Sequence, residues 1–407
     1  MVGAPGRAVW LPQANPGGLT ELDVAAGVVV GQGPDPFDNA DPGQGRDPLA
    51  HLIGLARTLL AEPPCTIAFS GGRDSSVLLA LFVDVARREG LDEPIAVTAR
   101  WDGDEASDER EWQERVVSYI GAEHWEILRP GTDLDLLGDE AVTALGRQGL
   151  MWPPPAYAFL PMVRRAARGS FVSGEGGDEA FGLWPHARFW SAVRHRRVPV
   201  WADVASAAVG CTPRAYRRHR WERALPPYQS WLRPEARAAF ARQLADDQAD
   251  DPLWWNRYQR VSRRRRAVEL TLATLDGLAA GEEARYAAPL LDAGFLRTLG
   301  AWGGYRGRGD RTGVMTQLFG DLLPDAILSR TSKASFGGVF WGPASRQFAE
   351  EWDGSGLDSH LIDVEALRQA WLSPVPVYGS ALPLHAAWLY DHTPRAGSPR
   401  EAESGTP

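Results

Sequence analysis

The stretch Phe69-Ser70-Gly71-Gly72-Arg73-Asp74-Ser75-Ser76 decides the fold of this chain. It follows the apolar run 66–68 and leads directly into a second apolar run, 77–83. This pattern predicts a short strand, a tight loop of small residues and a long helix. Such a junction gathers backbone N–H groups, hydroxyls and the positive end of a helix, so it predicts a phosphate-binding loop. The loop contains no lysine and its glycines are adjacent, which excludes the mononucleotide loop ending in Gly-Lys-Ser/Thr.

Two later motifs show which kind of phosphate loop this is. Residues 173–182 read S-G-E-G-G-D-E-A-F-G, and residues 329–336 read S-R-T-S-K-A-S-F. With S-G-G-R-D-S before them, these motifs resemble the synthetase domain of asparagine synthetases, from about residue 48 to about residue 390. The resemblance implies an ATP pyrophosphatase, which splits ATP between its α- and β-phosphates. Leu183 departs from the family pattern, which has a glycine there.

The pattern of apolar runs predicts the fold class. Strands are expected at 66–68, 94–100, 124–128 and 170–173, with helices between them, beginning with a helix capped by Asp47 and including one capped by Ser107. This alternation predicts an α/β fold with a doubly wound, mostly parallel sheet, as in adenine nucleotide α-hydrolases. Ligands of such sheets bind beyond the carboxyl ends of the strands, so the first two motifs are expected to face one crevice.

Four regions are expected along the chain. Residues 1–45 form a loosely structured lead-in with one β-like run at 27–30, and residues 46–200 form the ATP-pyrophosphatase α/β domain. Helical periodicity at 234–246 and 253–280 predicts a mainly helical portion over 201–392, followed by a disordered tail, 393–407. Asparagine synthetases carry an N-terminal glutaminase domain with a cysteine nucleophile, whereas Val2 follows Met1 here and the lead-in is too short for that domain.

Composition excludes several classes of function. The net charge of −9 argues against a general nucleic-acid partner, and the absence of an 18-residue apolar stretch argues against a membrane span, which favours the cytoplasm. The two cysteines indicate neither a disulfide framework nor a zinc site. Two arginine clusters, 217–220 and 263–266, either hold an acidic peptide or are exposed helix faces.

The phosphate loop and the strand ends supply the predicted nucleotide contacts. Backbone N–H groups and hydroxyls of the loop are expected to hold the β- and γ-phosphates of ATP, from Ser70, Gly71, Gly72, Ser75 and Ser76. Phe69 and the backbone around Thr98 and Ala99, at the ends of two strands, are expected to flank the adenosine. Ser173 and Gly174 are expected among the nucleotide-binding residues. The resemblance makes Asp74 and Asp178 ligands of Mg²⁺. Their alternative roles are a charge at a helix N-terminus and a solvated loop acid, respectively.

Two residues are predicted to act on the reaction. In related enzymes the position of Glu175 carries a group that deprotonates the attacking amine, although a structural acid paired with an arginine is the alternative. Lys333, the only lysine of the chain, is expected to neutralise charge on the α-phosphate as a carboxylate attacks it. Arg311 and Arg330 either contact phosphate or are solvated.

The segment before the acidic motif bears on the substrate. Asparagine synthetases have a threonine- and arginine-bearing segment there that holds aspartate, whereas residues 151–157 read M-W-P-P-P-A-Y. Aspartate is therefore not expected. The chain resembles stand-alone amide-forming relatives, of which lasso-peptide macrolactam cyclases are favoured, with a leader-binding protein and a leader protease as partners. A small-molecule amide or β-lactam synthetase, an enzyme using free ammonia and a non-catalytic nucleotide-binding partner stay open, as does the oligomeric state.

Overall fold

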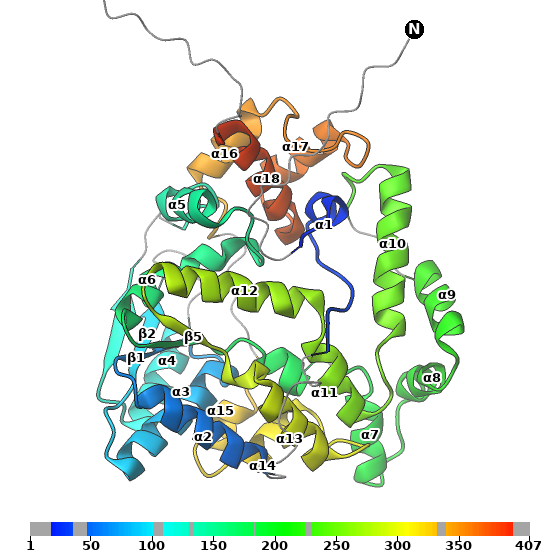
Figure 1. The fold of residues 1–407 in the computed structure, drawn as a ribbon. Helices are drawn as coiled ribbons and strands as arrows, with labels where there is room; N and C mark the ends of the chain where they lie inside the picture. The colour runs from blue at the N-terminus through cyan, green and yellow to red at the C-terminus, as the bar shows by residue number, and fades with distance from the viewer. Residues whose placement is uncertain are drawn as a thin grey trace, which may run out of the picture.

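The fold is built on a parallel sheet of five strands, in the order β3-β2-β1-β4-β5, which lies towards the left of the molecule in Figure 1. The structure is a computed structural model that describes residues 18–35, 47–100, 109–129, 134–182, 184–224, 229–331 and 339–393. The strands are β1 (Cys65–Ala68), β2 (Ile95–Ala99), β3 (Trp125–Leu128), β4 (Ser170–Val172) and β5 (Arg285–Ala287). The predicted α/β class and its first four strands are confirmed, and β5 is an addition from the second half of the chain.

The strand order creates a switch point between β1 and β4. The chain winds from β1 through β2 to β3 on one side, then returns to place β4 on the other side of β1. Ile67 of β1 is accordingly paired with Ala96 of β2 and with Val172 of β4. Because doubly wound sheets bind ligands where the winding reverses, the loops after β1 and β4 border the expected crevice.

Helices cover both faces of the sheet. On one face lie α2 (Pro48–Leu60), α3 (Arg73–Glu89) and α13 (Ala293–Gly303); on the other lie α6 (Leu160–Val163) and α12 (Arg266–Gly281) (Figure 1). Ile67 packs with Val77 of α3, whereas its neighbour Ala68 packs with Val163 of α6. Two buried faces explain why these strands read as continuous apolar runs.

Helix starts follow the sequence signals only in part. Asp47 caps α2 as predicted, and its carboxylate accepts hydrogen bonds from the N–H groups of Leu49 and Ala50. The predicted cap Ser107 lies outside the described residues, and α4 (Arg110–Ile120) begins with Glu109 at its N-cap position. The helix expected over 253–280 is interrupted, because α11 (Trp255–Arg263) ends before α12 begins at Arg266.

Most of the remaining helices form the upper and right-hand parts of the molecule in Figure 1, whereas α14 and α15 lie at its bottom, near α13. They are α1 (Glu21–Ala26), α5 (Asp139–Gln148), α7 (Ala187–Arg194), α8 (Trp201–Gly210), α9 (Arg214–Ala224), α10 (Pro234–Ala249), α14 (Arg311–Phe319), α15 (Asp325–Leu328), α16 (Pro343–Glu351), α17 (Val364–Leu372) and α18 (Ala381–His392). Short helical turns are η2 (Pro154–Phe159), η3 (Arg164–Ala166), η4 (Asp178–Gly182), η5 (Pro289–Leu291) and η6 (Tyr378–Ser380). In the part of the chain that the structure describes, no helix has the length and apolar character needed to cross a membrane.

Residues 18–35 differ from the loosely structured lead-in that was predicted. They contain α1, whose Thr20 and Asp23 form a reciprocal capping box, followed by the buried residues Val29 and Val30. The indole N–H of Trp231 donates to the carbonyl of Ala25 at 2.8 Å, so this segment packs against the second half of the chain. The sequence around it is rich in glycine and proline, which concealed one short, well-capped helix. The rest of the predicted lead-in and nearly all of the predicted disordered tail lie outside the described residues.

Candidate active site

The phosphate loop turns sharply between β1 and α3. Gly71 has a φ of 83°, and a Cβ atom there would lie 2.9 Å from the side chain of Gln113, so both conformation and space require glycine. The hydroxyl of Ser75 lies 3.2 Å from the backbone nitrogen of Ser70 and 3.1 Å from its hydroxyl. The N-terminus of α3 is thus bordered by two hydroxyls, the arrangement expected for an anion site.

Three predicted nucleotide contacts instead use their hydroxyls inside the protein. Ser76 is fully buried and donates to the carbonyl of Gly72 at 2.8 Å. Thr98 donates to the carbonyl of Phe69 at 2.7 Å, and Ser173 lies 2.8 Å from the hydroxyl of Tyr286. These hydroxyls support the loops from within the protein. For Ser76 this differs from the predicted phosphate contact through the hydroxyl, whereas the backbone contact at Thr98 and the nucleotide contact at Ser173 stay predictions.

A cavity of about 740 Å³ opens at the carboxyl ends of β1, β2 and β4. Nine of the predicted site residues line it: Phe69, Ser70, Gly72, Asp74, Ser75, Ala99, Gly174, Glu175 and Asp178. Its other wall is apolar and includes Pro153, Pro155, Ala156, Phe159 and Phe340. Gly71 is not part of the lining, and Lys333 lies outside the described residues. The predicted crevice between the first two motifs therefore exists, with the Trp-Pro segment facing them.

Asp74 and Asp178 meet at one guanidinium. Arg311, the first residue of α14, donates through Nη2 to Asp74 at 2.6 and 2.8 Å and through Nη1 to Asp178. Burial raises the pKa of the Asp74 carboxyl above its usual value, and the charge of Arg311 opposes that shift. A Cβ atom at Gly177 would lie 2.0 Å from Cγ of Asp74, so this glycine lets the acidic motif approach the phosphate loop. Arg311 was expected to contact phosphate or solvent, and its pairing with both acids was not predicted.

The same two carboxylates suit a magnesium ion. Both line the cavity and both lie within ion-pairing distance of one cation, so they converge on a single positive centre. No group of three or more histidine, cysteine, aspartate or glutamate residues that could hold a metal occurs among the residues the structure describes. Because Mg²⁺ in phosphate sites takes one or two carboxylates and completes its shell with phosphate oxygens and water, this donor set fits that ion.

Arg330 ties the third motif to the phosphate loop. Its guanidinium, in a residue only 8% exposed, donates to the carbonyl of Gly71 at 2.8 Å and forms a two-pronged ion pair with the buried carboxylate of Glu109. It also lies over the ring of Trp112, 4.8 Å from the centroid. Because Arg330 is buried, the solvated role is wrong; the residue also lines the cavity, and its phosphate contact stays a prediction.

Glu175 borders the cavity between two glycines. A Cβ atom at Gly176, whose φ is 95°, would lie 2.3 Å from Leu291, so the backbone here is closely packed. Burial, together with the charge of Glu175, raises the pKa of Tyr286 above the usual tyrosine value. This acid on the cavity wall therefore acts electrostatically on a neutral phenol behind it.

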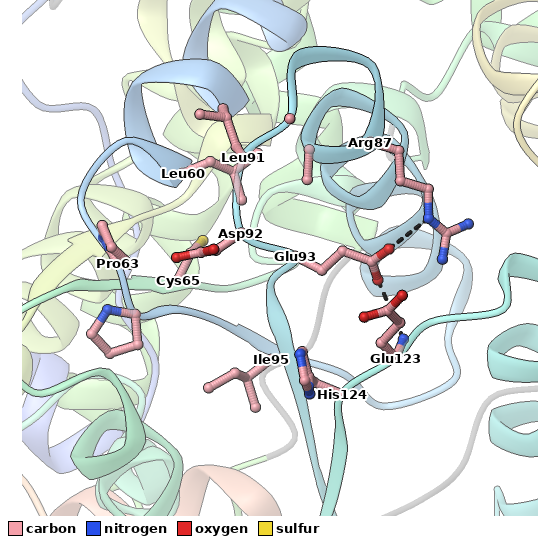
Figure 2. A pocket seen from close by; sticks show the side chains of 13 residues that line it. Leu60, Pro63, Cys65, Arg87, Leu91, Asp92, Glu93, Ile95, Glu123 and His124 are labelled. Carbon is pink, nitrogen blue, oxygen red and sulfur yellow. Dashed lines mark hydrogen bonds and ion pairs between the residues drawn. The ribbon is translucent and has the colours of Figure 1, made fainter.

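A second cavity, of about 690 Å³, lies at the opposite end of the sheet, where β1, β2 and β3 begin (Figure 2). Arg87 in its wall pairs with Glu93 at 2.5 Å, and burial raises the pKa of the Cys65 thiol to about 12, which keeps it neutral. This end of a parallel sheet carries neither the glycine loop nor the helix N-terminus of a phosphate site. The candidate active site is accordingly the cavity at the carboxyl ends.

A doubly wound sheet with a Ser-Gly-Gly-x-Asp-Ser loop at its switch point and two converging acids defines an adenine-nucleotide-binding α/β protein. The comparison with protein families makes this specific. The chain belongs to the asparagine synthase family, because the family model described as asparagine synthase matches residues 54–379. Membership identifies an ATP-dependent, amide-forming synthetase in general. Among the curated proteins, none matches the chain.

Proposed function

We propose that this protein is an AMP-forming carbon–nitrogen ligase that closes a macrolactam ring on a ribosomal peptide of the lasso type. The observation that carries the proposal is the composition of the crevice. One wall holds the phosphate loop and the pair Asp74 and Asp178, and the facing wall is built from Pro153, Pro155 and Phe159. An apolar wall fits a peptide chain better than a small, highly charged amino acid such as aspartate.

The phosphate-binding wall would hold ATP. Loop N–H groups and the hydroxyls of Ser70 and Ser75 would bind the phosphates at the positive end of α3. Asp74 and Asp178 would hold Mg²⁺, which when bound neutralises charge on the phosphates. Arg311 keeps the two carboxylates at one point before the nucleotide arrives.

The reaction would proceed in two steps. An oxygen of an Asp or Glu side-chain carboxylate of the peptide attacks the α-phosphorus, an acyl adenylate forms and pyrophosphate leaves. The peptide's N-terminal amine then attacks the acyl carbon, the amide bond forms and AMP leaves. Lys333 would neutralise the charge that accumulates in the first step, and Glu175 would accept a proton from the amine in the second.

Alternative acceptors share the first step and differ in the second. A small-molecule amide or β-lactam synthetase would form the amide bond within one metabolite or between two. An enzyme that uses ammonia would release a primary amide. The lasso-type proposal includes a leader-binding protein and a leader protease as partners, because the N-terminal amine of the core peptide must be freed before it attacks.

Product analysis tests the proposal. The protein is incubated with ATP, Mg²⁺ and either a linear peptide with an Asp or Glu side chain in its first half, or aspartate with ammonia. We expect AMP and pyrophosphate together with a peptide lighter by one water. ADP and phosphate would refute the adenylation chemistry, and AMP formation with aspartate and ammonia alone would refute the peptide substrate.

Glu175→Gln separates the two steps. We expect this variant to keep carboxylate-dependent exchange of pyrophosphate into ATP and to lose amide formation, because only the second step needs the base. Glu93→Gln, which changes an acid in the second cavity, is the matched control and should retain both activities. Equal loss of exchange and amide formation in Glu175→Gln would assign this residue to the architecture of the loop instead.

A further inference from the structure

Positive charge is concentrated on one part of this acidic protein. Helices α7, α8 and α9 lie on the side of the molecule away from the sheet (Figure 1). Residues 187–224 contain nine arginines and only two acids, Asp203 and Glu222, although the whole chain carries a net charge of −9. None of these residues lines the catalytic cavity. The basic region is therefore separate from the chemistry described above.

The loop between α7 and α8 combines arginines with exposed apolar side chains. Residues 194–201, which we call the basic tip, read Arg-His-Arg-Arg-Val-Pro-Val-Trp and join α7 to α8. Val198 is 93% exposed, Val200 69% and Trp201 80%. Exposed apolar side chains of this size in one short run mark an interaction site rather than ordinary surface.

A second segment adds to the same surface. The guanidinium of Arg194 donates to the carbonyl of Gly307 at 2.9 Å, which holds the loop after α13 against the end of α7. In that loop Tyr305 is 66% exposed, and Arg306 lies over the ring of Trp190. The side chains of Arg196 and Arg197 are exposed and form no ion pair with the described part of the chain. Aromatic rings and free guanidinium groups therefore lie together.

Helix α8 continues the apolar character of the tip. Its sequence, W-A-D-V-A-S-A-A-V-G, has one charged residue, and Ala207 is its only buried residue. A helix that is apolar on most sides is normally covered. A symmetric pairing with a second copy would place the arginines of one tip against those of the other, which opposes that arrangement. A surface with negative charge and an apolar layer beneath it matches both features.

We propose that the basic tip docks on an anionic membrane surface. Val198, Val200 and Trp201 enter the interface between headgroups and acyl chains, and Arg196 and Arg197 contact lipid phosphates. Tryptophan favours this interface, and exposed apolar side chains need no matching pocket there, as they would on a protein partner. The expectation of no membrane partner rested on the absence of a long apolar stretch, and it concerns spanning rather than peripheral binding. The inference does not depend on the proposed reaction.

Vesicle sedimentation tests this proposal with the full-length protein. Vesicles of phosphatidylcholine with about one quarter phosphatidylglycerol should bind the protein, and pure phosphatidylcholine should bind it far less. Arg196→Gln with Arg197→Gln should weaken binding roughly 30-fold, since each basic residue near such a surface contributes about 1 kcal/mol. Val198→Ser with Trp201→Ser should weaken it at least about tenfold, because both exposed apolar groups are removed. Raising salt to about 0.5 M should release the protein.

Matched controls use other exposed residues of the same types. Val375, which is 79% exposed, and Arg147 lie outside the basic region, so Val375→Ser and Arg147→Gln should bind vesicles as the unchanged protein does. Unchanged melting temperatures will show that the tip variants are folded. Equal vesicle binding by tip variants and controls, or no binding at low salt, would overturn the proposal. Tip-dependent binding to RNA without binding to vesicles would also overturn it and would assign the surface to nucleic acid.

Discussion

Replacing Arg330 with alanine removes the group that joins the third motif to the phosphate loop. The carboxylate of Glu109 would stay buried without its partner, since the Arg330 and Glu109 side chains are only 5% and 6% exposed. The carbonyl of Gly71 would lose its donor as well. Breaking a buried ion pair from one side costs about 3–5 kcal/mol, so we expect the free energy of unfolding to fall by that amount.

Urea titration followed by tryptophan fluorescence measures this loss. At a slope of about 3 kcal/mol per M, the midpoint should fall by roughly 1 to 1.7 M. Removing both charges, as in Arg330→Met with Glu109→Leu, should cost less than either single change, because no unpaired charge stays buried. Arg168→Ala, which removes an exposed ion pair, is the control and should change the midpoint little. A midpoint for Arg330→Ala within about 0.2 M of the unchanged protein would refute the reasoning.

Three further predictions concern the site and the core. Lys333→Ala should lower kcat and kcat/KM together by about a hundredfold, with little change in KM for ATP, and Lys333→Arg should recover only part of the lost rate. Steady-state kinetics measure both variants, and near-normal turnover in both would contradict the proposed role. Asp178→Asn should abolish most ATP-dependent turnover and raise the Mg²⁺ concentration needed for half-maximal rate. Its melting temperature should stay near that of the unchanged protein. Full activity would make Asp178 an ordinary loop acid. Burial lowers the pKa of His385 from 6.5 to about 4. As the pH falls from 6.5 towards 4, the unfolded chain therefore binds a proton that the folded chain does not. About 3 kcal/mol of stability should be lost in that pH window. Urea titrations at several pH values should show a flatter dependence for His385→Gln than for the exposed control His219→Gln, and identical pH dependences would contradict the assignment.

The sequence predicts the first four strands because each combines consecutive apolar or β-branched residues with flanking turn signals. The strand β5 has only three residues, Arg-Tyr-Ala, and becomes a strand through its pairing with β4. Its sequence contains no apolar run from which to predict it. A local sequence pattern therefore does not predict a short strand that forms only by pairing with a distant part of the chain.

The same limit applies to the candidate site. The motifs predict which loops meet, and the cavity between them bears this out. They do not predict where a hydroxyl points, so the Ser76 hydroxyl was assigned to phosphate although it donates to the carbonyl of Gly72. The direction of a hydroxyl depends on hydrogen-bond partners that the fold brings close, such as the carbonyl of Phe69 for Thr98 and the hydroxyl of Tyr286 for Ser173.

The docking of residues 18–35 has a consequence for the order in which the chain folds. Asp23 of this segment pairs with Arg266, and the backbone around Gly27 lies against Gly379. The first described part of the chain to leave the ribosome therefore finds its partners only after most of the chain has been synthesised. Closing contacts across such long loops is slow, so this early segment is expected to join the folded core late. Until then its apolar residues, among them Val24, stay available to chaperones.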